Sequence, residues 1–114
     1  MELKMKRVGN VLVIYLSGRL DIHLSVNVEE EINRIIDEEQ NSHLLLNLSN
    51  VEYMSSSGIR ILVSTMRKLQ ANMRKMKICN MNNDVKKIFD IVELIDIFEI
   101  FDTETEALES FIYS

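Results

Sequence analysis

Three consecutive serines, Ser55, Ser56 and Ser57, stand directly before Gly58 and a stretch of apolar residues with helical spacing. Hydroxyl groups at the start of a helix can do three kinds of chemistry. A serine can cap the helix by accepting hydrogen bonds from the unpaired N–H groups of the first turn. It can act as a nucleophile if a base activates it. It can also receive a phosphate, an anion that the free N–H groups and the helix dipole favour.

The nucleophile interpretation finds little support around the serines. A hydrolase elbow of the form Gly-x-Ser-x-Gly needs glycine on both sides, and only Gly58 is present. A base would have to come from His23 or His43, and no spacing supports either residue. With 3 glycines in the chain, a phosphate-binding Gly-x-x-x-x-Gly-Lys-Ser/Thr loop is excluded as well. An unusual serine hydrolase therefore stays a remote alternative.

Capping and modification both remain open on the residues alone. Capping or a polar turn is the simpler interpretation, although a cap requires one serine and not three. A phosphate would add about −1.5 to −2 charges to the turn near neutral pH. Arg60 follows Ser56 by four residues, and residues four apart face each other on a helix. Arg60 could therefore pair with a phosphate on Ser56.

The composition narrows the classes of protein to which the chain can belong. The 114 residues predict one domain spanning residues 1–114, and the net charge of −5 disfavours a nucleic-acid binder. With 1 cysteine and 2 histidines far apart in sequence, no internal disulfide and no metal site are expected. No segment is apolar over the length that a membrane span requires. We expect a cytoplasmic protein without a cofactor.

The strands that must position the serines are predicted from short apolar runs. Residues 3–18 read as two strands joined by a tight turn at Gly9 and Asn10, and residues 11–16 are apolar enough to be covered on both faces. Residues 44–48 and 76–79 predict two further buried strands, and residues 97–101 predict an edge strand.

Four segments have the periodicity of amphipathic helices. The first has an apolar stripe of Val28, Ile32, Ile35 and Ile36, with Ser25 as its expected cap. The second begins at the serines and runs along Ile59, Leu62, Val63, Met66 and Leu69. The third contains Val85, Ile88, Phe89 and Val92. The fourth begins at a capping box of Thr103 and Glu106 and should bury Leu108, Phe111 and Ile112.

A group of cations follows the serine helix and allows two interpretations. Its members are Arg67, Lys68, Arg74, Lys75 and Lys77. The simpler interpretation is that they compensate the helix dipole and keep the chain soluble. The functional interpretation is that they meet an acidic surface of a partner.

Three sequence blocks resemble the STAS family, the fold of bacterial anti-sigma factor antagonists. They are LSGRLD at residues 16–21, LLLNLSNVEYMSSSGIRIL at residues 44–62 and VKKIFDIVELIDIFEIF at residues 85–101. The middle block is the most specific, because it joins a hydrophobic strand, Val-x-x-Met, Ser-Ser-Gly and a helix. The resemblance implies an α/β fold with a mixed central sheet of four to five strands and about four packed helices.

The resemblance also implies a regulatory circuit in which the chain is a binding module and not an enzyme. The unphosphorylated antagonist binds an anti-sigma factor, which releases its sigma factor. That anti-sigma factor is typically a serine kinase that phosphorylates the antagonist, and a serine phosphatase resets the cycle. Carried over by position, the phosphate acceptor is Ser56, with Ser55 as a rival. The partner-binding residues are Asp21, Ser55, Ser57, Gly58 and Arg60.

The chain departs from the family pattern at two positions. Ser55 stands where the family commonly has aspartate, and Arg60 stands where a small residue is frequent. The alternative function is that of a STAS protein serving as a regulatory subunit of a transport system, or of another partner-switching complex without a sigma factor.

Overall fold

A five-stranded sheet forms the centre of the computed structural model, which describes residues 3–92 and 95–112. The strands lie in the order β1-β2-β3-β4-β5. The β1–β2 pair is antiparallel, and every other pair is parallel. The strands are β1 (Lys4–Val8), β2 (Val11–Leu20), β3 (His43–Met54), β4 (Met76–Cys79) and β5 (Glu99–Phe101). The predicted mixed α/β sheet is therefore confirmed.

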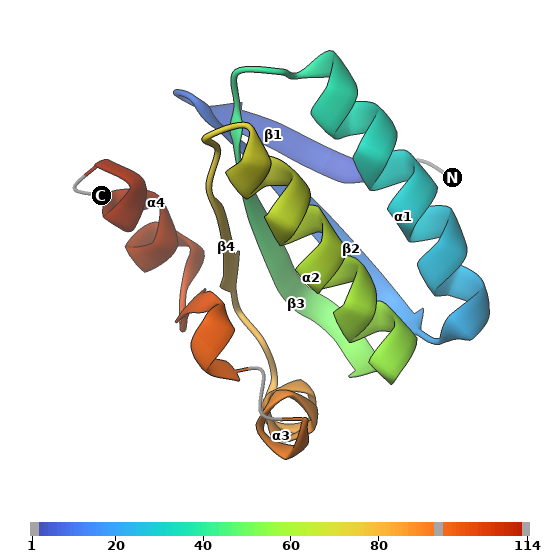
Figure 1. Ribbon diagram of the computed structural model, residues 1–114. Helices are drawn as coiled ribbons and strands as arrows, with labels where there is room; N and C mark the ends of the chain where they lie inside the picture. Colours follow the sequence, from blue (N-terminus) through green and yellow to red (C-terminus); the bar gives the residue numbers. More distant parts are fainter. Residues whose placement is uncertain (1–2, 93–94, 113–114) are drawn as a thin grey trace.

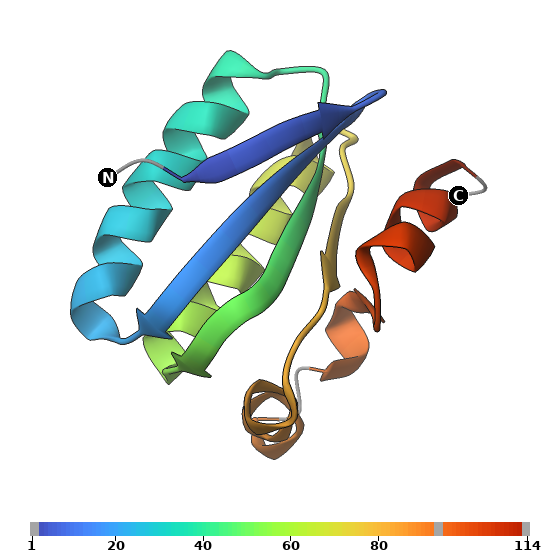
Figure 2. The ribbon, with the colours of Figure 1, turned by 180° about the vertical axis from the view of Figure 1, so that it is seen from behind.

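The helices lie on both faces of this sheet. They are α1 (Ile22–Glu38), α2 (Ser56–Ala71), α3 (Asn83–Ile91), the 3-10 turn η1 (Ile95–Ile97) and α4 (Glu104–Ile112). Helices α1 and α2 run side by side across one face (Figure 1), and the view from behind shows β1, β2 and β3 in front of them (Figure 2). Helix α4 covers the other face beside β4 and β5.

The residues of β2 are buried on both faces of the sheet, as the apolar run 11–16 predicts. Leu12, Ile14 and Leu16 pack under α1 and α2 in the larger core cluster. Val11 and Val13 point to the opposite face of the sheet and pack in the smaller core cluster, to which Ala107 of α4 belongs. Because successive side chains of a strand point to opposite faces, one apolar strand supplies both layers.

Several predicted bounds are too short. The strand expected at residues 44–48 runs from His43 to Met54, because residues 50–54 continue the pairing with β2 through two register shifts. The strand expected at 11–16 likewise continues to Leu20. These extra residues carry the two strands to the points where α1 and α2 begin.

The predicted cap of the first helix is wrong. Asp21, and not Ser25, caps α1 by accepting hydrogen bonds from the backbone N–H groups of His23 and Leu24. The helix thus starts one turn earlier, and Ser25 lies inside it with 2% of its surface exposed. In the part of the chain that the structure describes, the Ser25 hydroxyl has no hydrogen-bond partner.

A buried hydroxyl without a partner costs about 1–3 kcal/mol. We therefore expect Ser25→Ala to raise the free energy of unfolding by about 1 kcal/mol, because alanine removes the unpaired group and favours the helix. Urea denaturation followed by circular dichroism measures this change. A decrease of the same size would show that the hydroxyl is satisfied, for instance by a bound water.

Arg74 and Lys77 are buried, so the five cations that follow the start of the serine helix do not all lie on the surface. Arg74 donates hydrogen bonds to the carbonyl oxygens of Ile36, Glu39 and Ser42 and so satisfies the C-terminal end of α1. Lys68 forms an ion pair with Asp37 of α1, in which Nζ lies 3.0 Å from the carboxylate. Arg67 and Lys75 alone of the predicted group stay exposed without such a partner among the described residues.

Helix α4 is held on the sheet partly by polar groups. The Lys77 ammonium donates to the Ser110 hydroxyl at 2.9 Å and lies 4.4 Å from the centre of the Phe111 ring. Ala107 is the buried residue of this helix, whereas Leu108 and Phe111 are partly buried. The expectation that Ile112 is buried is wrong, because 74% of its surface is exposed.

Glu104 joins the first turn of α4 to the three strands β1, β2 and β3. Its carboxylate accepts hydrogen bonds from the Tyr15 hydroxyl at 2.7 Å and the Asn47 amide at 3.0 Å, and Lys6 Nζ lies 2.8 Å away. Burial alone would raise the pKa of Glu104, but the bonds from Lys6, Tyr15 and Asn47 together hold that pKa below its ordinary 4.5.

We expect the stability of the fold to depend on the ionisation of Glu104. Its folded pKa lies below the unfolded one, so its contribution is complete above pH 4.5 and is lost as the pH falls through the folded value. In Glu104→Gln this part of the pH dependence should disappear. Thermal unfolding at a series of pH values between neutrality and acid measures it, and an unchanged pH profile in the variant would contradict the assignment.

No helix of the described residues is long and apolar enough to cross a lipid bilayer.

Candidate partner-binding and modification site

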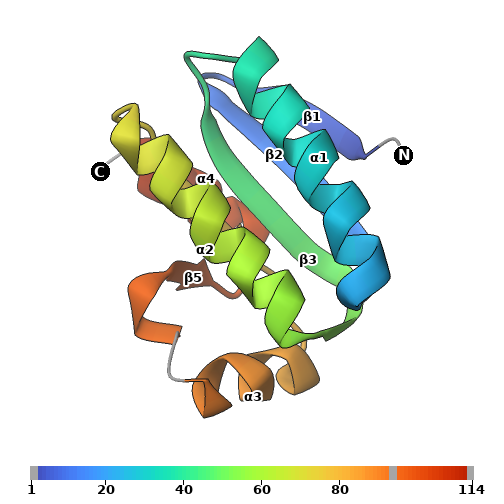
Figure 3. The same ribbon diagram turned by 45° about the vertical axis from the view of Figure 1, so that its right-hand side comes forward.

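The serine turn lies where two neighbouring parallel strands end. Strand β2 ends at Leu20 and β3 ends at Met54, and these two residues are partners in the sheet register. Helix α1 follows the first strand and α2 follows the second. The N-terminal ends of both helices therefore lie at the same end of the molecule (Figure 3).

Ser55 binds the end of β2 with both its backbone and its side chain. Its N–H and its hydroxyl each donate a hydrogen bond to the carbonyl oxygen of Leu20, both at 2.9 Å. The same hydroxyl accepts from the N–H of Gly58 at 3.2 Å and so caps α2. Aspartate and serine are both good capping residues, so serine at this position keeps the function of an aspartate there.

Gly58 allows the helix start to lie this close to β2. A Cβ atom at this position would lie 2.7 Å from Cγ of Met54 and 3.1 Å from the Leu20 carbonyl oxygen. The first contact is too short for any side chain, and the second is with backbone that cannot easily move. Gly58 is therefore required by the close approach of two backbones and not by an unusual backbone angle.

Ser56 is free where Ser55 is engaged. It is the first residue of α2, its side chain is exposed, and the described residues offer its hydroxyl no hydrogen bond. Ser57 is partly buried, and Arg60 is exposed one turn further along the same helix. The structure thus brings Ser56 and Arg60 to the surface of one helix, as their spacing predicts.

Asp21 lies beside the serine turn through its neighbour in sequence, Leu20. Its carboxylate caps α1, and the bond from the Leu24 N–H, followed by the bond from the His23 N–H, lowers its pKa. Asp21 is therefore ionised at neutral pH and exposed. The structure brings this predicted partner-binding residue to the same end of the molecule as Ser55, Ser56 and Ser57.

Two apolar side chains next to Asp21 were not anticipated. Ile22 and Val26 are 62% and 55% exposed on the first two turns of α1. The sequence could have indicated them, because they lie four residues apart and outside the stripe of Val28, Ile32 and Ile35 that the helix buries. These two side chains add apolar surface beside the charged turn.

The arrangement of the histidines does not support a serine nucleophile. His43 begins β3, whereas the serine turn follows the opposite end of this 12-residue strand. Nδ1 of His43 accepts the backbone N–H of Lys75, and burial lowers the His43 pKa. His23 has an exposed side chain, and no described hydrogen bond joins it to a serine. Among the described residues no group of histidine, cysteine, aspartate and glutamate side chains is arranged to hold a metal ion.

A family model of the STAS domain matches residues 2–107 of the chain. The chain belongs to the STAS domain family. This STAS domain is 31% identical over 108 residues to an anti-sigma F factor antagonist of Paenibacillus polymyxa. The aligned region covers 95% of this chain and 92% of that protein.

Solved structures show the same fold. The anti-sigma factor antagonist SpoIIAA in its unphosphorylated form matches with a TM-score of 0.81 at 24% identity, covering 99% of this STAS domain and 98% of that chain. The Bacillus cell fate determinant SpoIIAA in its phosphorylated form matches with a TM-score of 0.70 at 24% identity, covering 96% and 98%. The resemblance to the STAS fold read from residues 16–21, 44–62 and 85–101 is confirmed.

The different surroundings of Ser55 and Ser56 predict different effects on stability. Ser55→Ala removes the cap of α2 and one of the two bonds to Leu20, so we expect it to lower the free energy of unfolding by about 1 kcal/mol. Ser56→Ala should change it by less than about 0.5 kcal/mol, because the hydroxyl is exposed. Chemical denaturation of both variants measures the difference. Equal effects would contradict the capping role of Ser55.

Proposed function

We propose that this STAS domain is an anti-sigma factor antagonist that binds a kinase-type anti-sigma factor and thereby frees a sigma factor. Phosphorylation of Ser56 by that kinase switches binding off, and a serine phosphatase restores it. The family membership and the names of relatives such as the anti-sigma F factor antagonist of Paenibacillus polymyxa support the choice of partner.

The observation that carries the choice of Ser56 is the division of roles between two adjacent hydroxyls. The Ser55 hydroxyl donates to Leu20 and accepts from Gly58, so transfer of a phosphoryl group to this oxygen would remove the donated proton and disrupt the start of α2. The Ser56 hydroxyl is exposed at the first position of the helix. A kinase can reach Ser56 without unfolding the turn, and this accessibility favours it over Ser55 as the acceptor.

A phosphate on Ser56 would change the charge of the turn more than its shape. It would add about −1.5 to −2 charges at the positive end of the helix dipole, where an anion is stabilised. The turn would therefore stay folded and would present a dianion to the partner. On a tightly packed or acidic partner surface, the cost of desolvation and like-charge repulsion would disfavour docking.

The other partner-binding residues have separate roles in this proposal. Asp21 supplies an ionised carboxylate beside the turn, and Ser57 supplies a second polar group. Gly58 contributes by allowing the close approach to Leu20 and not by contact with the partner. Arg60 adds a positive charge one turn after Ser56.

The experiment that tests the proposal is an intact-mass measurement. The chain is incubated with Mg-ATP and the kinase-type anti-sigma factors of its organism, tested singly, with Ser55→Ala and Ser56→Ala in parallel. We expect one phosphate to add to the wild type and to Ser55→Ala, and none to add to Ser56→Ala, because Ser56 is the exposed one of the three serines in the turn.

A known antagonist serves as the positive control for each kinase. If a kinase labels that control and none labels this chain, the proposed control by phosphorylation is wrong. The serine turn would then serve only to cap α2 and to contact a partner. Loss of labelling in Ser55→Ala, with Ser56→Ala still labelled, would move the acceptor to the capping residue.

A further inference from the structure

The arginines outside α2 all have partners in the structure. These partners are carboxylates for Arg7 and Arg34, carbonyl oxygens for Arg74, and the Tyr53 ring for Arg19. Arg60 and Arg67 of α2 differ, since the described residues offer them no hydrogen bond, ion pair or ring. The chain has 18 acidic residues against 13 lysines and arginines, so carboxylates are not in short supply.

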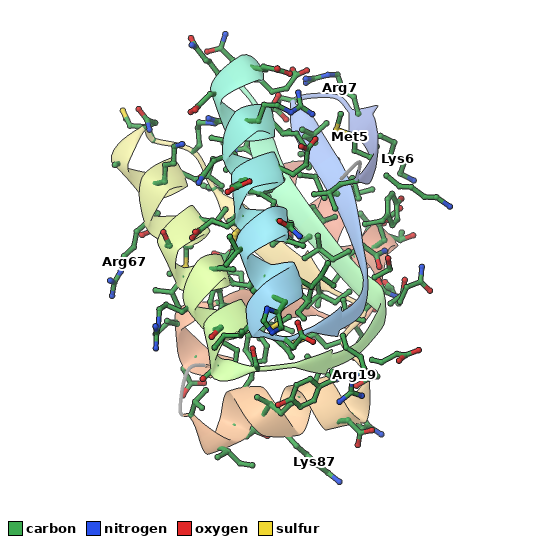
Figure 4. All side chains as sticks on the ribbon, turned by 90° about the vertical axis from the view of Figure 1, so that its right-hand side faces the viewer. Met5, Lys6, Arg7, Arg19, Arg67 and Lys87 are labelled. Carbon is green, nitrogen blue, oxygen red and sulfur yellow. The ribbon has the colours of Figure 1, made fainter. Side chains whose placement is uncertain are left out.

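The two unpaired arginines lie on one exposed stripe that begins at the serine turn. Ser56, Arg60, Ser64 and Arg67 follow one another at intervals of four, four and three residues, and all four are exposed. Residues at these intervals share one face of a helix. We call these four residues the α2 ridge. Arg67 projects from α2 away from the neighbouring elements (Figure 4).

The charge of the α2 ridge is opposite to that of the protein as a whole. Helix α2 contains no acidic residue, whereas the net charge of the chain is −5. Lys68, the remaining cation of this helix, is already paired with Asp37 of α1. The ridge is therefore a strip of free positive charge on an acidic molecule.

We propose that the α2 ridge docks on an acidic face of the anti-sigma factor, and that Arg60 and Arg67 select this partner by charge. The identity of the partner rests on the proposed function above. Two observations support the docking surface: it is continuous with the serine turn through Ser56, and its arginines have no partner among the described residues. Seven residues of helix span about 10 Å, so the partner should present carboxylates at about that separation.

The same geometry gives phosphorylation an electrostatic effect on docking. The two arginines give the ridge two positive charges, and a phosphate on Ser56 would bring about −1.5 to −2 charges to it. Arg60 lies one turn from that phosphate and can pair with it. Phosphorylation would then cancel the charge by which the ridge recognises its acidic partner, in addition to any repulsion.

Association kinetics with the anti-sigma factor test the proposal. In stopped-flow measurements at low and high salt, we expect Arg60→Glu with Arg67→Glu to slow association about tenfold or more at low salt, because steering by charge is lost. The rate of the wild type should fall with added salt, whereas that of the double variant should not. Arg60→Gln with Arg67→Gln should give an intermediate rate.

The matched control is Lys4→Glu with Lys87→Glu, which changes the net charge by the same amount. Both lysines are exposed, and neither has a partner among the described residues. The control should associate at nearly the wild-type rate. Equal slowing in both double variants would show that only the net charge matters and would overturn the role of the ridge.

A second measurement does not depend on the partner's identity. Poly-glutamate is titrated into the isotope-labelled chain, and amide shifts are recorded by NMR. We expect shifts along α2 that the Arg60→Glu and Arg67→Glu pair abolishes. If no anti-sigma factor binds the wild type, the proposed function fails, and this titration still decides whether the ridge binds acidic surfaces. The inference would be overturned if the titration gave no shifts or gave shifts outside α2. It would also be overturned if duplex DNA, titrated in the same way, bound the two arginines more tightly than poly-glutamate.

Discussion

The contact between Ser55 and the Leu20 carbonyl is the constraint on which the candidate site of this STAS domain depends. It joins the start of α2 to the end of β2 with two hydrogen bonds, and Gly58 leaves the space that this approach requires. Because Asp21 follows Leu20 directly, the same contact fixes the distance between the starts of α1 and α2. The contact holds Ser55 against β2, and the next residue, Ser56, begins the helix with its side chain exposed.

Most of the fold could be predicted from local patterns. The continuous apolar run in β2 identifies a strand covered on both faces, and the periods of the α1 and α2 stripes identify helices and the faces they bury. The predictions fail where a contact with a residue far away in the sequence determines whether a side chain is buried. Lys77 is charged and sits in a strand, and its burial depends on contacts with β5 and α4, both of which come later in the chain. Arg74 is similarly buried because the open end of α1 supplies its acceptors.

The sequence predicts that the serines, Gly58 and Arg60 lie together, but it does not predict the structural role of each residue. The run of serines with Gly58 marks the turn, and its spacing to Arg60 places both on one helix. The sequence does not distinguish Ser55 from Ser56, because the Leu20 oxygen that engages Ser55 lies 35 residues away. The error at Ser25 has a related origin: serine and aspartate cap equally well, and the length of β2 decided between them.

The construction of the turn from two strands determines what a partner can recognise. The segment from Val51 to Leu62 is continuous in sequence, but its shape depends on an oxygen of Leu20 and on the sheet register that holds Leu20 opposite Met54. A free peptide with this sequence would lack both. A partner that binds here would therefore recognise a conformational epitope, assembled from segments far apart in the chain, which a linear copy of the serine segment would not reproduce.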